Sequence, residues 1–207
     1  MTYELSTPII KTLISSLRDS NTDALRFRHN VKEITKLLLN EALKEESLST
    51  KTVETWNGSE QHEVIDDESF VVVTVLRAGM PMLEAVMETL PNITGGFLAM
   101  KRDETTHKSK LYYDRLPDCS GKKVILVDVM LATGGSLSDG IDIIKTKNPL
   151  AIVCLNVIGS PEGIKAIEKR YSDVDIYISQ IDEKLNQNKF IIPGLGDAGD
   201  REYNTPE

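Results

Sequence analysis

The stretch from residue 124 to residue 136 has the residue types and the spacing of a phosphate-binding site. An apolar run ends at Asp128, and a few residues later the turn Thr133-Gly134-Gly135-Ser136 opens an amphipathic segment. The glycines let the backbone approach an anion, and the unpaired N–H groups of a following helix would point at it. The pattern predicts a pocket for a phosphorylated ligand, with Asp128 at a strand end, where a carboxylate can contact a sugar diol or a metal ion.

An ordinary strand-to-helix turn is the alternative interpretation of the same residues. In that case Thr133 or Ser136 caps the helix and the glycines relieve strain. The acid upstream favours the phosphate pocket. A Walker-type nucleotide loop is excluded, because no Gly-Lys-Ser/Thr follows at the required spacing.

Two further loops bring cations to the ends of predicted strands. Arg77 lies in Leu-Arg-Ala-Gly at 76–79, and Arg102 lies in Lys-Arg-Asp-Glu at 101–104. A solvated charged loop is the commoner explanation of either one alone. Together with the glycine turn they predict two anion subsites, one for a monophosphate at a helix N-terminus and one for a more highly charged group held by arginines.

The segment Gly-Leu-Gly-Asp-Ala-Gly at 194–199 matches the dinucleotide-binding fingerprint, but its context is wrong. Only eight residues follow Gly199, whereas that fingerprint needs a helix, a second strand and a distant acid. We expect these glycines to let the backbone press against a flat ligand such as a nucleobase, with a simple tight turn as the alternative.

Composition indicates one soluble globular domain. The chain has 207 residues, of which 40% are hydrophobic and 27% charged, and its net charge of −8 disfavours nucleic acid as a partner. No signal-peptide pattern or membrane-length apolar run is present, which predicts a cytoplasmic protein without a membrane partner. Cys119 and Cys154 are expected to be free thiols, and the three scattered histidines predict no metal cage.

The order of the apolar segments predicts an α/β fold with a mainly parallel sheet flanked by helices. Two helices, from residue 8 and over 23–46, precede a β-hairpin arm formed by residues 51–56 and 60–65 around Asn57-Gly58. Strands are expected at 70–76, 96–100, 123–128, 151–157 and 174–178, and helices at 81–90, 135–147 and 162–170. Residues 101–118 are expected to be irregular, and residues 179–207 to form a flap over the carboxyl edge of the sheet.

Four motifs resemble the uracil phosphoribosyltransferase family, and the match extends over nearly the whole chain. They are Val-Leu-Arg-Ala-Gly-Met at 75–80, Lys-Arg-Asp-Glu at 101–104, Val-Asp-Val-Met-Leu-Ala-Thr-Gly-Gly-Ser at 127–136 and Ile-Ile-Pro-Gly-Leu-Gly-Asp-Ala-Gly-Asp at 191–200. Two departures stand out. Val129 replaces the usual proline, which predicts a slightly looser loop, and Ser6-Thr7-Pro8 replaces the usual His-Pro near the N-terminus.

The resemblance implies a type I phosphoribosyltransferase fold and the transfer of a phosphoribosyl group from 5-phospho-α-D-ribose 1-diphosphate (PRPP) to uracil, giving UMP and diphosphate with Mg²⁺. It implies Asp128 and Arg102 as catalytic residues and a metal held mainly through PRPP. The implied PRPP-binding residues are Arg77, Arg102, Asp128, Val129, Met130, Leu131, Ala132, Thr133, Gly134, Gly135, Ser136 and Asp197. The implied uracil-binding residues are Ile191, Gly196, Asp197 and Ala198. No side chain is an obvious general base.

The expected organisation is a single domain over residues 1–207, with N-terminal helices (1–50), the hairpin arm (51–65), the core sheet (70–178) and the base-binding flap (179–207). A homodimer or tetramer that uses the arm is expected, because an isolated hairpin cannot bury its own apolar residues. GTP activates some relatives, so GTP is a candidate activator. Two rival functions remain: a nucleotide-sensing RNA-binding regulator of the same fold, and a phosphoribosyltransferase for another base.

Overall fold

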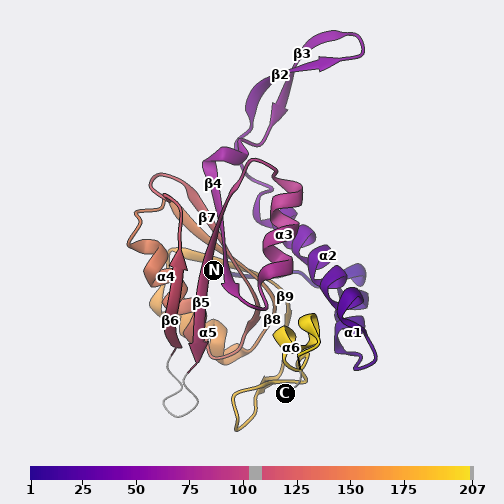
Figure 1. Ribbon diagram of the computed structural model, residues 1–207, viewed down its shortest axis with the longest axis vertical. Coiled ribbons are helices and arrows are strands. Elements are labelled where there is room, and N and C mark those ends of the chain that lie inside the picture. Colours follow the sequence, from indigo (N-terminus) through magenta and orange to yellow (C-terminus); the bar gives the residue numbers. More distant parts are fainter. Residues whose placement is uncertain (103–108, 206–207) are drawn as a thin grey trace.

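A seven-stranded sheet runs through the middle of the molecule (Figure 1). The computed structural model describes residues 1–102 and 109–205, and it describes only the backbone of residues 101, 102, 109–111 and 114. The strand order is β1-β9-β8-β7-β4-β5-β6, and each neighbouring pair is parallel except β5 and β6. The strands are β1 (Thr2–Glu4), β4 (Phe70–Leu76), β5 (Thr94–Arg102), β6 (Ser109–Arg115), β7 (Lys123–Leu131), β8 (Ala151–Gly159) and β9 (Val174–Ile181).

The central strands are buried on both faces, which explains their nearly continuous Val, Ile and Leu sequences. One face packs against α1 (Pro8–Arg18), α2 (Ala24–Ala42) and α3 (Met80–Thr89). The other face packs against α4 (Gly135–Lys145) and α5 (Pro161–Arg170). The sheet is therefore the middle layer of three, as the alternation of apolar segments predicts (Figure 1).

Side-chain caps set the N-termini of several helices, among them α1, α2 and α5. Thr7 accepts a hydrogen bond from the Ile10 N–H at the start of α1, and Asp23 does the same for Arg26 at the start of α2. Ser160 caps α5. The predicted second helix extends too far, since α2 ends at Ala42 where the polar run 44–47 no longer offers an apolar face to the core.

Two predictions about the sheet are wrong in detail. The segment 101–118 contains β6, an edge strand antiparallel to β5, whose polar and tyrosine-rich sequence lacks the apolar run that marks a buried strand. The strands β7, β8 and β9 each continue beyond their predicted ends, because pairing with a parallel neighbour holds them extended. Asp128 consequently lies within β7 and not at its end.

The hairpin arm consists of β2 (Ser49–Thr55) and β3 (Gly58–Val64), and most of its strand residues are exposed. Thr55 pairs with Gly58, so the turn is centred on Trp56 and Asn57, one residue earlier than predicted. Trp56 is 96% exposed at this turn. The arm projects from the body at the end opposite α6 (Figure 1).

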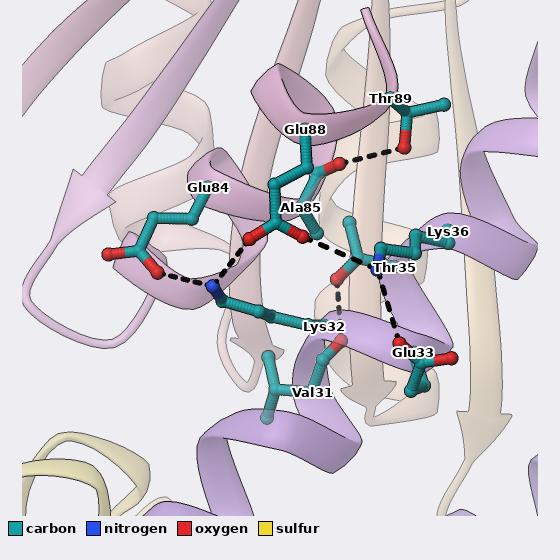
Figure 2. Close-up of polar contacts among 9 residues, drawn as sticks. All are labelled: Val31, Lys32, Glu33, Thr35, Lys36, Glu84, Ala85, Glu88 and Thr89. Carbon is teal, nitrogen blue, oxygen red and sulfur yellow. Dashed lines mark hydrogen bonds and ion pairs between the residues drawn. The ribbon is translucent and has the colours of Figure 1, made fainter.

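An ion-pair network joins α2 to α3 (Figure 2). Lys32 Nζ lies 2.7 Å from Glu84 and 2.8 Å from Glu88, and Lys36 lies 3.3 Å from Glu88. Since α3 begins directly after the Arg77 loop, the network fixes the helix that supports this loop against α2. These side chains are partly exposed, so each pair contributes about 1 kcal/mol or less.

The C-terminal flap starts after β9 and contains the two-residue strands β10 (Lys184–Leu185) and β11 (Ile191–Ile192), followed by α6 (Ala198–Tyr203). Ile191, Leu195 and Ala198 of the flap join the core cluster formed with α1, α2 and α3. No helix of the described residues is both long and apolar enough to cross a membrane.

Candidate functional site at the carboxyl edge of the sheet

Three chain segments meet at the carboxyl edge of the parallel strands: residues 77–79 after β4, residues 132–134 after β7, and the C-terminal flap. In open α/β sheets, ligands bind at this edge. The structure therefore brings together the glycine turn, the Arg77 loop and the 194–199 segment, as the sequence predicts.

The glycine turn leads directly into α4. Gly134, with φ of +78°, is the residue at the N-cap position, so neither Thr133 nor Ser136 occupies that position as the alternative interpretation requires. A Cβ on Gly134 would lie 3.1 Å from the carbonyl oxygen of Gly163, so both the backbone angle and the packing favour glycine. The helix α4 has eleven residues, and a helix N-terminus of this kind can bind phosphate.

Ser160 holds the residue before this turn in place. Its Oγ donates a hydrogen bond of 2.6 Å to the carbonyl oxygen of Ala132, and it accepts one of 3.0 Å from the Gly163 N–H. Because Ser160 is fully buried at the start of α5, it joins the turn after β7 to the neighbouring helix. The turn is thus rigidly supported from α5.

The surroundings of Asp128 disfavour the ionised form of its carboxyl group. It retains some exposed surface, but protein atoms surround the carboxyl group and burial raises its pKa from 3.8 to about 7. The backbone N–H groups of Met130 and Val129 bond to the carboxylate and offset part of this rise. A proline at 129 could not supply the second of these donors. The looser loop expected from Val129 stays a prediction.

Asn156 on β8 pairs with Asp128 in the sheet register and fixes its backbone. The Asn156 Nδ2 donates a hydrogen bond of 2.8 Å to the Asp128 carbonyl oxygen. Asn156 is fully buried, and its Oδ1 has no hydrogen-bond partner in the described part of the chain. Sequence reasoning missed this residue, because it lies inside an otherwise apolar strand.

Arg77 is engaged by the flap. Its Nη2 lies 2.8 Å from the Asp200 carboxylate, and its Nη1 lies 3.3 Å from the Thr205 hydroxyl. The Arg77 side chain is 54% exposed, so it remains accessible to an anionic ligand. Arg102 is the last residue of β5, but its side chain lies outside the described residues, as do Asp103 and Glu104 altogether.

A cavity of about 320 Å³ lies between the glycine turn and the flap. Its lining residues are Met130, Ala132, Lys189, Phe190, Ile191, Ile192, Pro193, Gly194, Leu195 and Gly196. The walls are mainly apolar and backbone, which suits a small flat ring with polar edges. The cavity joins Ala132 of the predicted phosphate site to Ile191 and Gly196 of the predicted base site.

Sequence reasoning missed several walls of this cavity, Phe190 above all. Its ring is 54% exposed and carries no sequence motif. Gly194 shows the close approach that the tight-turn alternative describes, since a Cβ there would lie 2.2 Å from the Ile191 carbonyl oxygen.

Two residues of the predicted base site, Ala198 and Asp197, contribute to the packing and capping of the flap. Ala198 is fully buried in the core and is not among the residues that line the cavity. Asp197 caps α6, with its Oδ1 accepting a hydrogen bond of 2.9 Å from the Asp200 N–H. Their predicted roles toward ligands stay predictions.

Glu202 is a second acid near this site, and sequence reasoning missed it. It is fully buried on α6, and neither of its carboxylate oxygens has a hydrogen-bond partner among the described residues. Burial, followed by the negative charge of Asp128, raises the pKa of Glu202 from 4.5 to about 9, whereas Arg28 and Arg77 oppose the shift. Glu202 is therefore a neutral acid at pH 7, whereas Asp128, with a pKa of about 7, ionises at much lower pH than Glu202.

The raised pKa of Glu202 makes stability depend on pH. The unfolded chain releases this proton above about pH 4.5, while the folded chain keeps it up to about pH 9, so the free energy of unfolding falls as pH rises between these values. Glu202→Gln keeps the shape without the ionisation. We expect its Tm to match that of the wild type at about pH 5 and to exceed it by about 5 °C or more at about pH 9, measured by circular dichroism. A Tm difference that stays constant over this range would mean that Glu202 is charged in the folded protein.

In the described part of the chain, no three His, Cys, Asp or Glu side chains are grouped so that they could hold a metal ion. Asp128 offers carboxylate oxygens, the ligand type that Mg²⁺ prefers. A Mg²⁺ ion that binds here would take most of its ligands from a phosphorylated substrate and water.

Comparisons with known proteins agree with this geometry. A family model described as uracil phosphoribosyltransferase matches residues 4–205. A relative from Aquifex aeolicus named uracil phosphoribosyltransferase is 42% identical over 203 residues, which is 98% of each chain.

Solved structures agree as well. One protein of Aquifex aeolicus superimposes with a TM-score of 0.94, at 42% identity and 98% coverage of both chains. A hypoxanthine phosphoribosyltransferase of Staphylococcus aureus shares the fold alone, with a TM-score of 0.51 at 13% identity over 76% of each chain. The α/β fold is that of the type I phosphoribosyltransferases, and the chain belongs to the uracil phosphoribosyltransferase family.

Proposed function

We propose that this protein transfers the 5-phosphoribosyl group of PRPP to uracil and releases UMP and diphosphate. The observation that carries the proposal is the 320 Å³ cavity, which is lined on one side by Met130 and Ala132, just before the glycine turn and α4, and on the other side by the flap. A phosphate at the helix N-terminus and a flat base in the cavity would lie side by side, as they do in a nucleoside monophosphate.

Each loop takes one part of the substrates. The 5′-phosphate binds the backbone of residues 132–136, the ribose hydroxyls bind Asp128, and the diphosphate binds Arg77 and Arg102. Uracil is framed by Ile191, Gly196 and Ala198, and Asp197 contacts PRPP or its metal. The whole chain acts as one phosphoribosyltransferase domain.

Catalysis rests on positioning and electrostatics. Breaking the bond at the anomeric carbon produces an oxocarbenium-like sugar and a highly charged leaving group, so arginines aimed at the diphosphate stabilise the transition state. The charge of Asp128 beside the sugar stabilises positive charge on the ring. Mg²⁺, held mainly through PRPP, neutralises the diphosphate when bound. Because the pKa of Asp128 is about 7, its contribution falls as pH drops below that value.

The direct test measures the turnover of uracil, cytosine and hypoxanthine in the presence of PRPP and Mg²⁺. The wild type and Asp128→Asn are assayed in parallel. Only uracil should give product, and Asp128→Asn should fold but turn over about a hundredfold more slowly because a charged contact is lost. Turnover of another base in preference to uracil would contradict the substrate assignment. If the variant loses activity only in proportion to its loss of thermal stability, Asp128 has a structural role.

Phe190 provides the test of the base pocket. Phe190→Ala removes a half-exposed side chain from the cavity wall. The hydrogen bonds that the Phe190 backbone makes with the Asn186 N–H and with the Asn186 Oδ1 remain. We expect KM for uracil to rise by about three- to tenfold, the strength of a ring-stacking contact, with KM for PRPP unchanged. The matched control is Leu150→Ala, which truncates a residue 74% exposed outside this cavity. Equal changes in both KM values would place the base elsewhere.

We propose that the hairpin arm packs on a second copy of the chain and forms a homodimer or tetramer. The arm buries little of its own surface, and Trp56 is almost fully exposed at its turn. An exposed tryptophan at the end of a small hairpin is typical of a contact surface.

A shortened arm tests this assembly. Replacing residues 51–62 by an Asn-Gly turn joins Thr50 to Glu63, which are paired across the hairpin. Light scattering at about 20 μM should give the mass of a dimer or larger for the wild type and a monomer for the variant. The exposed-residue control, Leu150→Ser, should keep the wild-type mass. A fully active wild-type monomer would exclude the proposed assembly. Activation by GTP and a cytoplasmic location stay predictions.

A further inference from the structure

Arg201, in α6 of the flap, contacts the end of α1, a ring of α2 and the flap residue Leu195. Its guanidinium donates hydrogen bonds to the carbonyl oxygens of Leu17, Asp19 at 2.6 Å and Leu195 at 2.7 Å. It also lies 4.5 Å above the centre of the fully buried Phe27 ring. The proposed function, as described above, assigns no role to Arg201.

Two of these acceptors, Leu17 and Asp19, lie at the end of α1, where helix C-termini favour cations. The Asp19 carbonyl also accepts a hydrogen bond of 3.1 Å from the Thr22 N–H. A planar guanidinium can donate in several directions while it stacks on a ring, whereas a lysine ammonium is a point charge on a flexible stem. Arg201 therefore fixes the third acceptor, Leu195, relative to the rigid corner between α1 and α2. The Leu195 carbonyl cannot rotate without breaking this contact.

Fixing this carbonyl also fixes the next N–H group. The peptide bond between Leu195 and Gly196 is trans, so its C=O and N–H point in opposite directions. With the carbonyl bound to Arg201, the Gly196 N–H points away from the guanidinium. Both residues line the 320 Å³ cavity.

We propose that Arg201 is a positioning residue that directs the Gly196 N–H toward a carbonyl oxygen of the base in this cavity. The role rests on the proposed function, since it assumes that the cavity takes uracil. Arg201 touches neither substrate and acts only through the peptide plane. It thereby determines which ring edge the flap accepts.

Arg201→Lys is the decisive variant, because it keeps the charge but loses the fork of donors. We expect KM for uracil to rise about tenfold or more, the loss of one oriented hydrogen bond, with KM for PRPP and kcat little changed. The matched control is Arg170→Lys, since Arg170 also lies over a tyrosine ring and pairs with a carboxylate, but on α5. It should behave as the wild type does.

Thiouracils separate orientation from general loosening. Sulfur is a weaker acceptor than oxygen, so wild-type protein should discriminate against either 2-thiouracil or 4-thiouracil, whichever replaces the oxygen that the Gly196 N–H meets. Arg201→Lys should lose most of that discrimination. An unchanged KM for uracil, or an equal loss for uracil and both thiouracils, would overturn the positioning role.

A measurement on the wild type covers the case in which Arg201→Lys melts below the assay temperature. Uracil titrated into ¹⁵N-labelled protein with PRPP analogue present should move the Gly196 amide proton downfield, and the discriminated thiouracil should move it less. An amide that does not respond to uracil overturns the inference. Wild-type protein that fails to turn over uracil at all contradicts the proposed function itself, which distinguishes the two failures.

Discussion

Parallel pairing of the three central strands is the constraint on which the site depends. The strands β4, β7 and β8 run in one direction and are buried on both faces. The loops that carry polar groups therefore lie at the two ends of these strands. Their carboxyl ends converge, so the Arg77 loop, the turn before α4 and the start of α5 occupy one place. The backbone N–H groups of α4 then point to the same edge as the Arg77 loop.

Burial of acids at this edge creates the electrostatic character of the site. Asp128 and Glu202 come from a strand and a helix far apart in sequence, and the negative charge of Asp128 disfavours ionisation of Glu202. One negative charge is easier to accommodate than two in such surroundings, so the deeper Glu202 stays neutral. Arg28 contributes from α2, where its guanidinium also donates to the Glu202 backbone carbonyl. A protein of net charge −8 thus holds a balanced local set of charges where an anionic substrate is expected.

The flap depends on arginines as much as on apolar packing. Arg201 attaches it to the end of α1, and Arg28 attaches it to α2, while Leu195 and Ala198 extend the core into it. On the other side Asp200 binds Arg77, which couples the proposed diphosphate loop to α6 at the end of the flap. The cavity is consequently formed by segments whose relative positions are set by hydrogen bonds to backbone carbonyls.

The sequence by itself determined the parallel α/β core, the hairpin arm and the turn that leads into α4, because these follow from local periodicity and turn chemistry. Its motifs were sufficient to identify the family. Only the tertiary structure decided that Asp128 lies inside β7, that Arg77 is paired with Asp200 and that Phe190 borders the cavity. It also decided that Glu202 is buried with no hydrogen-bond partner for its carboxylate among the described residues. Each of these depends on contacts between segments that are distant in the chain, and a single sequence carries no local signal for such contacts. The edge strand β6 escaped prediction for a related reason, since its polar pattern becomes a strand only when β5 offers its backbone as a partner.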